Sequence, residues 1–287
     1  MLADVKVTRP LLRYHGGKWR LADWLISHFP AHRVYVEPFG GAASSVLLQK
    51  PRSYSEVYND LDGEIVNVFR VTQCPEKRDR LMEMLRFTPY ARAEFNLAWE
   101  PTDCPVESAR RVIIRAQMGF GSAGATKGST GFRRDTARRY TTAMMDWVRY
   151  RDCLPPIIER MTGVQIENRP ALDVIRTNDA DGVLFYIDPP YMHDTRVMDG
   201  GTRYYRHEMS NDDHAELLEQ VTNLRGMVIL NGYQSQLYDT ALTGWTKYSK
   251  QSRAAAARGT AIRTEVIWLN RACAAALSQQ EIQGRLL

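Results

Sequence analysis

The sequence contains no long hydrophobic run. No apolar stretch approaches the ~20 residues that a membrane-spanning helix needs, so no transmembrane helix is expected. The first residues, 1–10, also lack the apolar core of a signal peptide. Both absences indicate a cytoplasmic protein without a membrane partner.

Cysteine is scarce and scattered. The 287 residues contain four cysteines, Cys74, Cys104, Cys153 and Cys273, and no two of them form a Cys-x-x-Cys pair. A zinc site built on such pairs is therefore not expected, and we predict no bound metal. Isolated thiols of this kind are typical of a reduced, cytosolic protein.

The common glycine patterns of nucleotide sites are also missing. A strand beginning at Val34 is followed by the small-residue loop Glu37-Pro38-Phe39-Gly40-Gly41-Ala42-Ala43-Ser44. This loop is not Gly-x-Gly-x-x-Gly and no Walker lysine follows it, which disfavours a dinucleotide or a triphosphate. Small residues between a strand and a helix still let a cofactor approach backbone N–H groups closely.

The most informative stretch is Leu184-Phe185-Tyr186-Ile187-Asp188-Pro189-Pro190-Tyr191. Its apolar half predicts a buried strand, and two prolines end that strand because neither can donate to a ladder. Asp188 and Tyr191 are therefore expected where a central strand passes into a loop. In open α/β sheets ligands bind at that carboxyl edge.

Two further stretches resemble ligand sites. In Tyr14-His15-Gly16-Gly17-Lys18 the glycine pair allows close approach to a ligand before a helix begins. A second strand, residues 55–58, ends in Asn59-Asp60-Leu61-Asp62. An acid at such a strand end commonly binds ribose hydroxyls, which we expect of Asp60, whereas Asp62 is expected to cap the next helix.

The α/β pattern is interrupted over residues 75–161. Residues 107–117 predict a helix, and residues 119–134 are too rich in Gly and Ser for a regular element. Between Arg110 and Arg151, Lys and Arg clearly outnumber acids, which favours contacts with phosphates and grooves, although a solvated surface has the same composition. The net charge of +5 alone is weaker evidence for a polyanionic partner. The candidate nucleic-acid contacts are Arg115, Lys127, Arg133, Arg134, Arg138 and Arg139.

The α/β pattern then resumes. Residues 164–167 and 227–230 predict strands, and Ser210-Asn211-Asp212-Asp213 predicts a capping box at the start of a helix. Residues 245–249 and 263–270 predict two antiparallel strands joined by a small, basic loop, residues 253–259. The tail, residues 271–287, could pack on this domain or on a second subunit.

Four motifs, in this order, resemble those of the Dam-like (alpha-class, D12 type) DNA adenine-N6 methyltransferases. Residues 14–18 are similar to the family's Lys-Trp-x-Gly-Gly-Lys opening, and residues 37–41 to its Glu-Pro-Phe-x-Gly cofactor loop. Asp60 falls on the ribose-binding acid, and Asp188-Pro189-Pro190-Tyr191 on the catalytic tetrapeptide. The likeness covers roughly residues 11–72 and 164–270. Tyr14 replaces the family's Trp, and Ala43 replaces a glycine.

This resemblance implies a fold and an activity. The fold is α/β: a Rossmann-like class I methyltransferase sheet with an inserted, mainly helical target recognition domain. Residues 1–74 and 162–287 would form the domain that binds S-adenosylmethionine, and residues 75–161 the inserted domain that recognises duplex DNA. The implied reaction is site-specific methylation of adenine N6 by a bacterial or phage-encoded protein, as a monomer or a homodimer.

The resemblance also assigns residues. Asp188 and the Pro189 carbonyl would accept the N–H bonds of a flipped adenine, so that the freed lone pair attacks the sulfonium methyl, while Tyr191 stacks on the base. The implied catalytic set is Asp188, Pro189, Pro190 and Tyr191. The implied cofactor set is Tyr14, Gly17, Lys18, Glu37, Pro38, Phe39, Gly41, Asp60 and Asp188.

Other readings of the motifs differ in testable ways. A cytosine-N4 methyltransferase could use the same acceptors but usually carries Ser in place of Asp188. Cytosine-C5 chemistry needs a Cys after Pro, whereas Cys74 and Cys104 precede Pro. Protein-glutamine and RNA methyltransferases share Pro-Pro-Tyr but rarely have a basic insert. A catalytically silent DNA-binding module would have no need of an intact Asp188 and Lys18.

Overall fold

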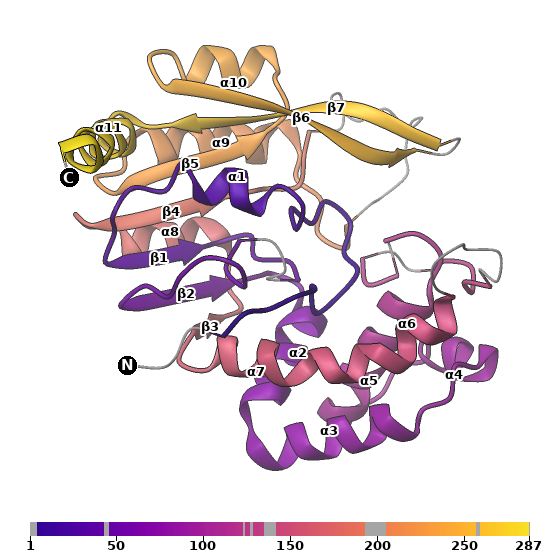
Figure 1. The fold of residues 1–287 in the computed structure, drawn as a ribbon. Helices are drawn as coiled ribbons and strands as arrows, with labels where there is room; N and C mark the ends of the chain where they lie inside the picture. The colour runs from indigo at the N-terminus through magenta and orange to yellow at the C-terminus, as the bar shows by residue number, and fades with distance from the viewer. Residues whose placement is uncertain are drawn as a thin grey trace.

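The computed structural model describes residues 5–42, 46–122, 124–126, 129–134, 142–192, 205–256 and 259–286. Within these ranges the chain forms a seven-stranded sheet in the order β3-β2-β1-β4-β5-β7-β6 (Figure 1). The strands are β1 (Val34–Glu37), β2 (Ser55–Asn59), β3 (Gln165–Glu167), β4 (Val183–Ile187), β5 (Met227–Gly232), β6 (Thr246–Ala256) and β7 (Gly259–Leu269).

The direction of the strands divides the sheet in two. Strands β1 to β5 run parallel to one another, whereas β7 is antiparallel to both β5 and β6. This mixed arrangement confirms the predicted Rossmann-like α/β fold. Parallel pairs need long crossovers, and helices lie in those between β2 and β3 and between β4 and β5.

Alternation along the strands gives the sheet two buried faces. One face contributes Tyr35, Tyr186 and Ile229 to a core shared with α1 (Ala22–Ile26), α2 (Gly63–Gln73) and α11 (Arg271–Leu286). The other contributes Val36, Phe185 and Val228 to a core shared with α8 (Ala171–Asn178), α9 (Asn211–Thr222) and α10 (Gln236–Ala241). All five residues of β4 are buried, as a central parallel strand requires.

The tail packs on the sheet rather than extending away from it. Helix α11 contacts β5 and β7, and its Cys273 and Leu277 are buried in the core. The sequence left open whether the tail packs on its own domain or on a second subunit, and the structure contains the packing on its own domain. No helix in the described ranges is long and apolar enough to cross a membrane.

The last two strands are longer than the sequence predicts. The expected loop over residues 253–259 is largely strand, because β6 continues to Ala256 and β7 begins at Gly259. Backbone pairs such as Ala254↔Ala261 extend the ladder through residues without a period-2 pattern. Since β5 pairs only with the Val266–Leu269 part of β7, the hairpin projects well past the end of β5 (Figure 1).

The regular elements described between Pro75 and Met161 are helical. They are α3 (Pro75–Phe87), α4 (Arg92–Leu97), α5 (Pro105–Met118), α6 (Ala143–Tyr150), the 3₁₀ turn η1 (Arg151–Cys153) and α7 (Leu154–Met161). We call this part the helical segment. Pro75 and Pro105 stand in the first turns of their helices, where a missing N–H costs nothing. The helical segment begins with α3 at Pro75 and ends with α7 at Met161, and its role as a separate inserted domain remains a prediction.

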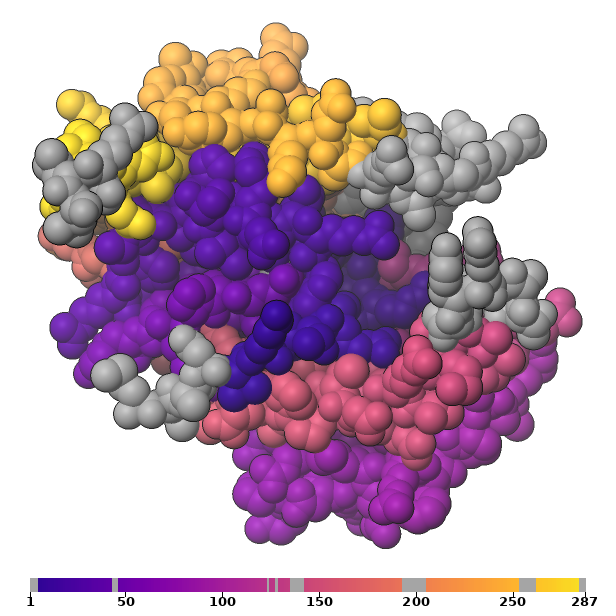
Figure 2. Space-filling view, in the orientation of Figure 1, coloured from indigo at the N-terminus to yellow at the C-terminus, as the bar shows by residue number. Residues whose placement is uncertain are grey.

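The N-terminal stretch around residues 9–11 packs between the helical segment and the sheet. Tyr150 Oη donates to the Leu11 carbonyl at 2.7 Å, and the Arg9 guanidinium lies over the Tyr150 ring. In Figure 2 this stretch, in indigo, borders the pink surface of the helical segment. One buried cluster consequently runs from the sheet into α3 and α5.

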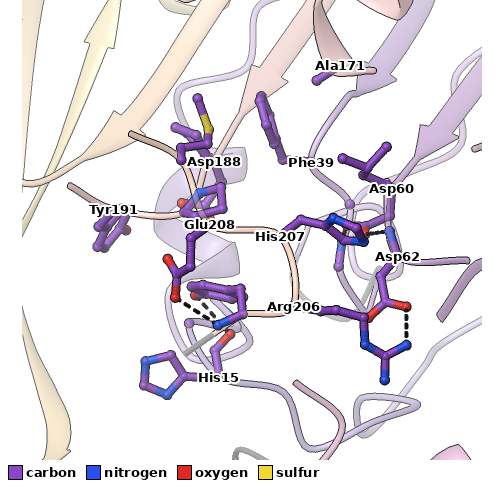
Figure 3. A pocket seen from close by; sticks show the side chains of 18 of the residues that line it. His15, Phe39, Asp60, Asp62, Ala171, Asp188, Tyr191, Arg206, His207 and Glu208 are labelled. Carbon is purple, nitrogen blue, oxygen red and sulfur yellow. Dashed lines mark hydrogen bonds and ion pairs between the residues drawn. The ribbon is translucent and has the colours of Figure 1, made fainter. Parts of the chain in front are cut away.

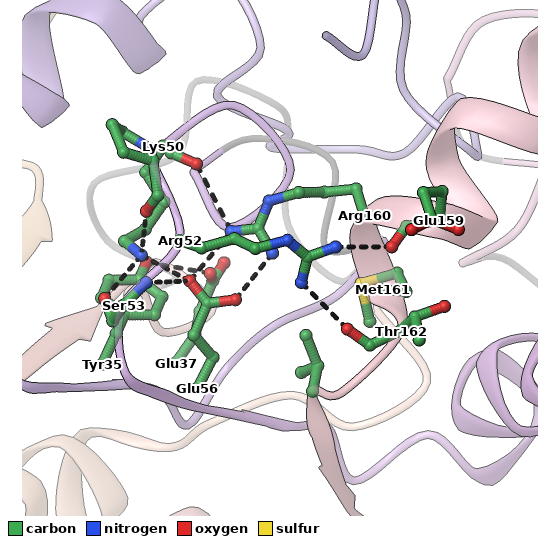
Figure 4. A network of polar contacts seen from close by, with 12 residues as sticks. Tyr35, Glu37, Lys50, Arg52, Ser53, Glu56, Glu159, Arg160, Met161 and Thr162 are labelled. Carbon is green, nitrogen blue, oxygen red and sulfur yellow. Dashed lines mark hydrogen bonds and ion pairs between the residues drawn. The ribbon is translucent and has the colours of Figure 1, made fainter. Parts of the chain in front are cut away.

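A buried ion cluster fixes the end of the helical segment to the sheet (Figure 4). Both carboxylate oxygens of Glu56, on β2, accept from Arg160 on α7, at 2.6 and 2.9 Å. Lys50 Nζ lies 2.6 Å from the same carboxylate. Arg52 adds bonds to the carbonyls of Glu159 and Thr162. A bidentate pair of this kind fixes orientation as well as distance.

Candidate functional site

The predicted motifs meet at the carboxyl edge of the parallel strands. Glu37 ends β1, Asp60 follows β2, and Asp188 follows β4. A pocket of about 270 Å³ lies at this edge, and Figure 3 shows residues from these strand ends around it. Its lining includes Tyr14, Gly17, Lys18, Glu37, Phe39, Gly41, Asp60, Asp188, Pro189, Pro190 and Tyr191. Of the residues assigned by resemblance, Pro38 is outside this lining, and its carbonyl accepts from Asn59.

The glycines of the two loops are required by their surroundings. Gly16 and Gly41 both have positive φ, 76° and 49°, which disfavours any other residue. A Cβ at Gly41 would lie 2.8 Å from the Tyr14 ring, and one at Gly16 would collide with Tyr205. Tyr14 therefore packs its ring directly against the loop that follows β1. Ala43, the departure in that loop, lies outside the described residues.

The two acids after β2 have separate tasks, as predicted for Asp62. Asp62 caps α2 by accepting from the Glu64 N–H at 3.0 Å. Asp60 instead accepts from the N–H groups of Gly41 and Asp62, both at 2.8 Å. Burial raises the pKa of Asp60 to about 6, although these two amides oppose the rise. Asp60 thus joins the loop after β1 to the end of β2.

Lys18 connects the Gly-Gly turn to the tetrapeptide. Its Nζ lies 3.0 Å from Asp188 Oδ2, 2.8 Å from the Gly16 carbonyl oxygen and 4.7 Å from the centre of the Tyr191 ring. Burial alone would lower the pKa of Lys18, but the Asp188 and Glu265 carboxylates hold it above its ordinary value. Burial raises the pKa of Asp188, and Lys18 opposes that rise.

Two polar residues that the sequence did not assign complete this centre. Asn231, near the end of β5, donates from Nδ2 to Asp188 Oδ1 at 2.8 Å and to Tyr191 Oη at 2.9 Å. Tyr191 Oη donates in turn to Glu265 Oε2 on β7, at 2.7 Å. The available signal was a polar residue at the end of an apolar strand. Their meeting depends on strand register, which the sequence does not contain.

Glu37 lies deeper in the same pocket. Tyr35 Oη donates to its carboxylate at 3.0 Å. Burial raises the pKa of Glu37 to about 8, and the nearby Asp188 charge adds to the rise. Glu37 is thus protonated near neutral pH until a cation approaches it.

The pocket is acidic although the chain carries a net charge of +5. Its described lining contains only Lys18 and Arg206 among Lys and Arg. The acids of the same lining are Glu37, Asp60, Asp62, Asp188, Glu208, Asp213 and Glu216. A ligand carrying positive charge suits this lining better than a polyphosphate does.

The segment that follows the tetrapeptide returns to the pocket. Tyr205 Oη donates to the His15 carbonyl at 3.3 Å. Arg206 pairs with Asp62 at 3.3 Å and with Glu64 at 3.0 Å. Tyr205 and Arg206 line the pocket, but the sequence around them contains no motif, so the sequence did not identify them. In the described part of the chain no group of three or more His, Cys, Asp or Glu could hold a metal ion.

The candidate DNA contacts divide into three kinds. Arg115 and Arg133 are buried, the first paired with Glu64 and the second 2.9 Å from Asp146. Both guanidinium groups are thus turned into the protein rather than toward a partner. Arg134 is exposed. Lys127, Arg138 and Arg139 lie outside the described residues.

Sheet order, strand direction and a pocket at the carboxyl edge define a Rossmann-like methyltransferase fold. Residues 14–96 match the family model of the D12 class N6 adenine-specific DNA methyltransferases. A DNA adenine methylase from Serratia marcescens is 30% identical over 69 residues, which are 24% of this chain and 25% of that protein. The chain thus matches about a quarter of that relative's length. Together these matches confirm the resemblance to the Dam-like D12 type.

Proposed function

We propose that this protein transfers a methyl group from S-adenosylmethionine to N6 of an adenine in duplex DNA. The observation that carries the proposal is the position of Asp188-Pro189-Pro190-Tyr191, which follows β4 directly into the acidic pocket beside Lys18. The D12-class match over residues 14–96 supports the same activity through the cofactor side of the pocket.

The residues present fit S-adenosylmethionine. The molecule carries a sulfonium and an ammonium, which match the excess of carboxylates in the lining. Asp60 is in place to accept from ribose hydroxyls, and Glu37 and Asp188 to accept from the ammonium. Tyr14 and Phe39 supply apolar walls. When bound, the cofactor would supply an electrophilic methyl group: N6 would gain the methyl as its bond to sulfur breaks, one N6 proton would be released to solvent, and S-adenosylhomocysteine would remain.

The chain's own task is to make N6 a nucleophile. The amine is a poor one, because its lone pair is delocalised into the ring. Asp188 and the Pro189 carbonyl would accept its two N–H bonds and draw the nitrogen toward tetrahedral geometry. Lys18 favours the ionised form of Asp188, in which both carboxylate oxygens are acceptors. The rate would then come from positioning and electrostatics.

Adenine must leave the helix to reach this pocket, because its amine is buried in the duplex. Tyr191 would receive the flipped base by stacking. Its ring is already confined, with the Tyr233 ring centre 4.4 Å away and Lys18 above one face. A confined ring loses little further entropy when a base stacks on it.

The helical segment, which spans residues 75–161, is proposed as the target recognition domain. Its exposed basic and aromatic groups include Arg134 and Phe120, the latter 71% exposed. Backbone hydrogen bonds from Phe120 N–H to the Gly131 carbonyl and from Arg133 N–H to the Met118 carbonyl hold together the base of the loop that follows α5. The projecting β6–β7 hairpin, with Lys250 and Arg263, is a second basic element.

The test is transfer of tritiated methyl groups from S-adenosylmethionine to unmodified duplex DNA. The wild-type protein should label DNA, and Asp188→Ala should lose about 100-fold or more of the rate. Asp181→Ala, which removes an acid that is 84% exposed, is the matched control and should behave as wild type. Labelling by Asp188→Ala at the wild-type rate would contradict the assignment.

A further inference from the structure

Register brings three side chains from different strands to one point. Ile187 of β4 is paired with Leu230 of β5, so Asp188 and Asn231 come next in the same register. Gly232 of β5 is paired with Val266 of β7, so Glu265 lies one residue beyond the paired region. The polar groups therefore occupy neighbouring positions along the edge of the sheet at which the pocket lies.

A directional chain of hydrogen bonds joins them. Both N–H bonds of the Asn231 amide are used, one on Asp188 Oδ1 and one on Tyr191 Oη. Tyr191 then donates its own proton to Glu265. The reverse amide orientation would set an oxygen against the Asp188 carboxylate, where it has nothing to accept. The hydrogen bonds thus run from Asn231 to Asp188 and to Tyr191, and from Tyr191 to Glu265.

Stability alone does not account for Glu265. Its side chain is buried, with 6% of the residue exposed, and it lies near a second carboxylate, Asp188. The Lys18 ammonium has to balance the charges of both the Asp188 and the Glu265 carboxylates rather than one of them. Burying a further carboxylate is costly unless it makes strong bonds. The bond from Tyr191 is the one that Glu265 makes toward the tetrapeptide, and a carboxylate is the stronger acceptor for it.

We infer that Asn231 and Glu265 are positioning residues of the proposed methyl transfer. Asn231 orients the Asp188 carboxylate and the Tyr191 hydroxyl relative to each other, and Glu265 fixes the Tyr191 ring through that hydroxyl. The inference rests on the proposed function and extends it to two strands outside the tetrapeptide. Neither residue touches the reacting atoms.

A double-mutant cycle tests the part played by Glu265. Glu265→Ala and Tyr191→Phe should each lower kcat about 10-fold to 100-fold, the scale of a reacting group misplaced by about 1 Å. The double variant should be no worse than the more impaired single variant, because the Tyr191–Glu265 bond can be lost only once. Glu265→Gln keeps an acceptor oxygen and should recover most of the rate. Glu219→Ala, an exposed glutamate on α9, is the control.

The pH dependence of kcat tests Asn231. The groups facing Asp188 are Lys18, Glu37, Glu265, Asn231 and the tyrosines 186, 191, 233 and 238. Removing the amide in Asn231→Ala should move the acidic limb to higher pH, because a bond to the ionised form is lost. Glu265→Gln should move it to lower pH, because a negative neighbour is lost. A merely structural role would not shift the limb in opposite directions.

The outcomes separate this inference from the function it rests on. If the wild-type protein transfers no methyl group to DNA, the proposed function fails. If it does, but the effects of Glu265→Ala and Tyr191→Phe multiply and neither limb moves, only the inference fails. Calorimetric titration with S-adenosylmethionine establishes that each variant folds. Glu265→Gln and Tyr191→Phe preserve side-chain size and carry the test should Glu265→Ala unfold.

Discussion

The Lys18 ammonium lies 3.0 Å from the Asp188 carboxylate, and both groups are largely shielded from solvent. This ion pair joins the Gly-Gly turn at the N-terminus to the tetrapeptide behind β4. A buried carboxylate without a cation would tend to take up a proton, which would remove an acceptor. The pair thus links the Gly-Gly turn, which carries Lys18, to the ionisation of the Asp188 carboxylate.

Lys18→Met and Asp60→Asn should each weaken S-adenosylmethionine binding about 10-fold or more, since each removes a charged hydrogen-bonding group from the pocket. DNA affinity and target choice should stay unchanged, because neither residue belongs to the helical segment. Titration calorimetry measures the first effect and a duplex-binding assay the second. Wild-type cofactor affinity in both variants would refute the assignment.

Cofactor binding should release a proton through Glu37. The pKa of this acid, raised by burial to about 8, keeps it protonated at pH 7 in the free protein. An ammonium bound beside it would favour the carboxylate and lower that pKa. Calorimetry at pH 7 in buffers of different ionisation enthalpy should therefore report release of up to about one proton. Glu37→Gln should abolish it. Equal apparent enthalpies in every buffer for the wild type would count against this role.

The adjacent arginines Arg133 and Arg134 of the helical segment should respond differently to substitution. Arg134→Ala should lower the salt slope of DNA binding by about one unit if the exposed side chain meets a phosphate. Arg133→Ala should chiefly destabilise the protein, because it leaves Asp146 without this partner. Filter binding at several salt concentrations, combined with thermal unfolding, distinguishes the two. A stable Arg133→Ala variant with the larger salt effect would reverse the assignment.

The cluster beside β2 should stabilise the fold in a pH-dependent way. Burial alone would raise the pKa of Glu56, but Arg160 and Lys50 hold it below its ordinary value. The folded protein therefore binds fewer protons here than the unfolded chain. This stabilisation should be complete above the ordinary pKa and should disappear as the pH falls through the folded one.

Glu56→Gln should accordingly cost about 3–5 kcal/mol at neutral pH, because two cations lose their buried partner. Asp173→Asn breaks an exposed pair with Arg176 and should cost about 0–1 kcal/mol. Urea unfolding at pH 7 and at acidic pH provides the comparison. The difference between wild type and Glu56→Gln should shrink in acid, and a constant difference would contradict the linkage.

Much of the sheet and several helix starts could be predicted locally. The strand before Asp188 is a continuous apolar run, which a buried parallel strand requires. The capping box at Ser210 forms as expected, with Ser210 Oγ accepting from the Asp213 N–H at 3.1 Å. Asp62 caps α2 for the same local reason. Such features depend on residues a few positions apart.

What could not be predicted depends on distant partners. Whether an arginine faces DNA or the protein depends on a partner elsewhere in the chain, as Arg115 shows with Glu64. The Tyr191–Glu265 bond depends on the register between β5 and β7. The length of the β6–β7 hairpin depends on backbone pairing in a stretch without hydrophobic alternation. In each case the deciding interaction is tertiary.

The most direct measurement is the identity of the base that is modified. Unmethylated duplex DNA would be incubated with the purified protein and S-adenosylmethionine, digested to nucleosides and analysed by mass spectrometry, with Asp188→Asn as the control. N6-methyladenine is expected in the wild-type digest, with a loss of about 100-fold or more in the control. N4-methylcytosine, or no methylated nucleoside under conditions in which the protein binds both cofactor and DNA, would contradict it.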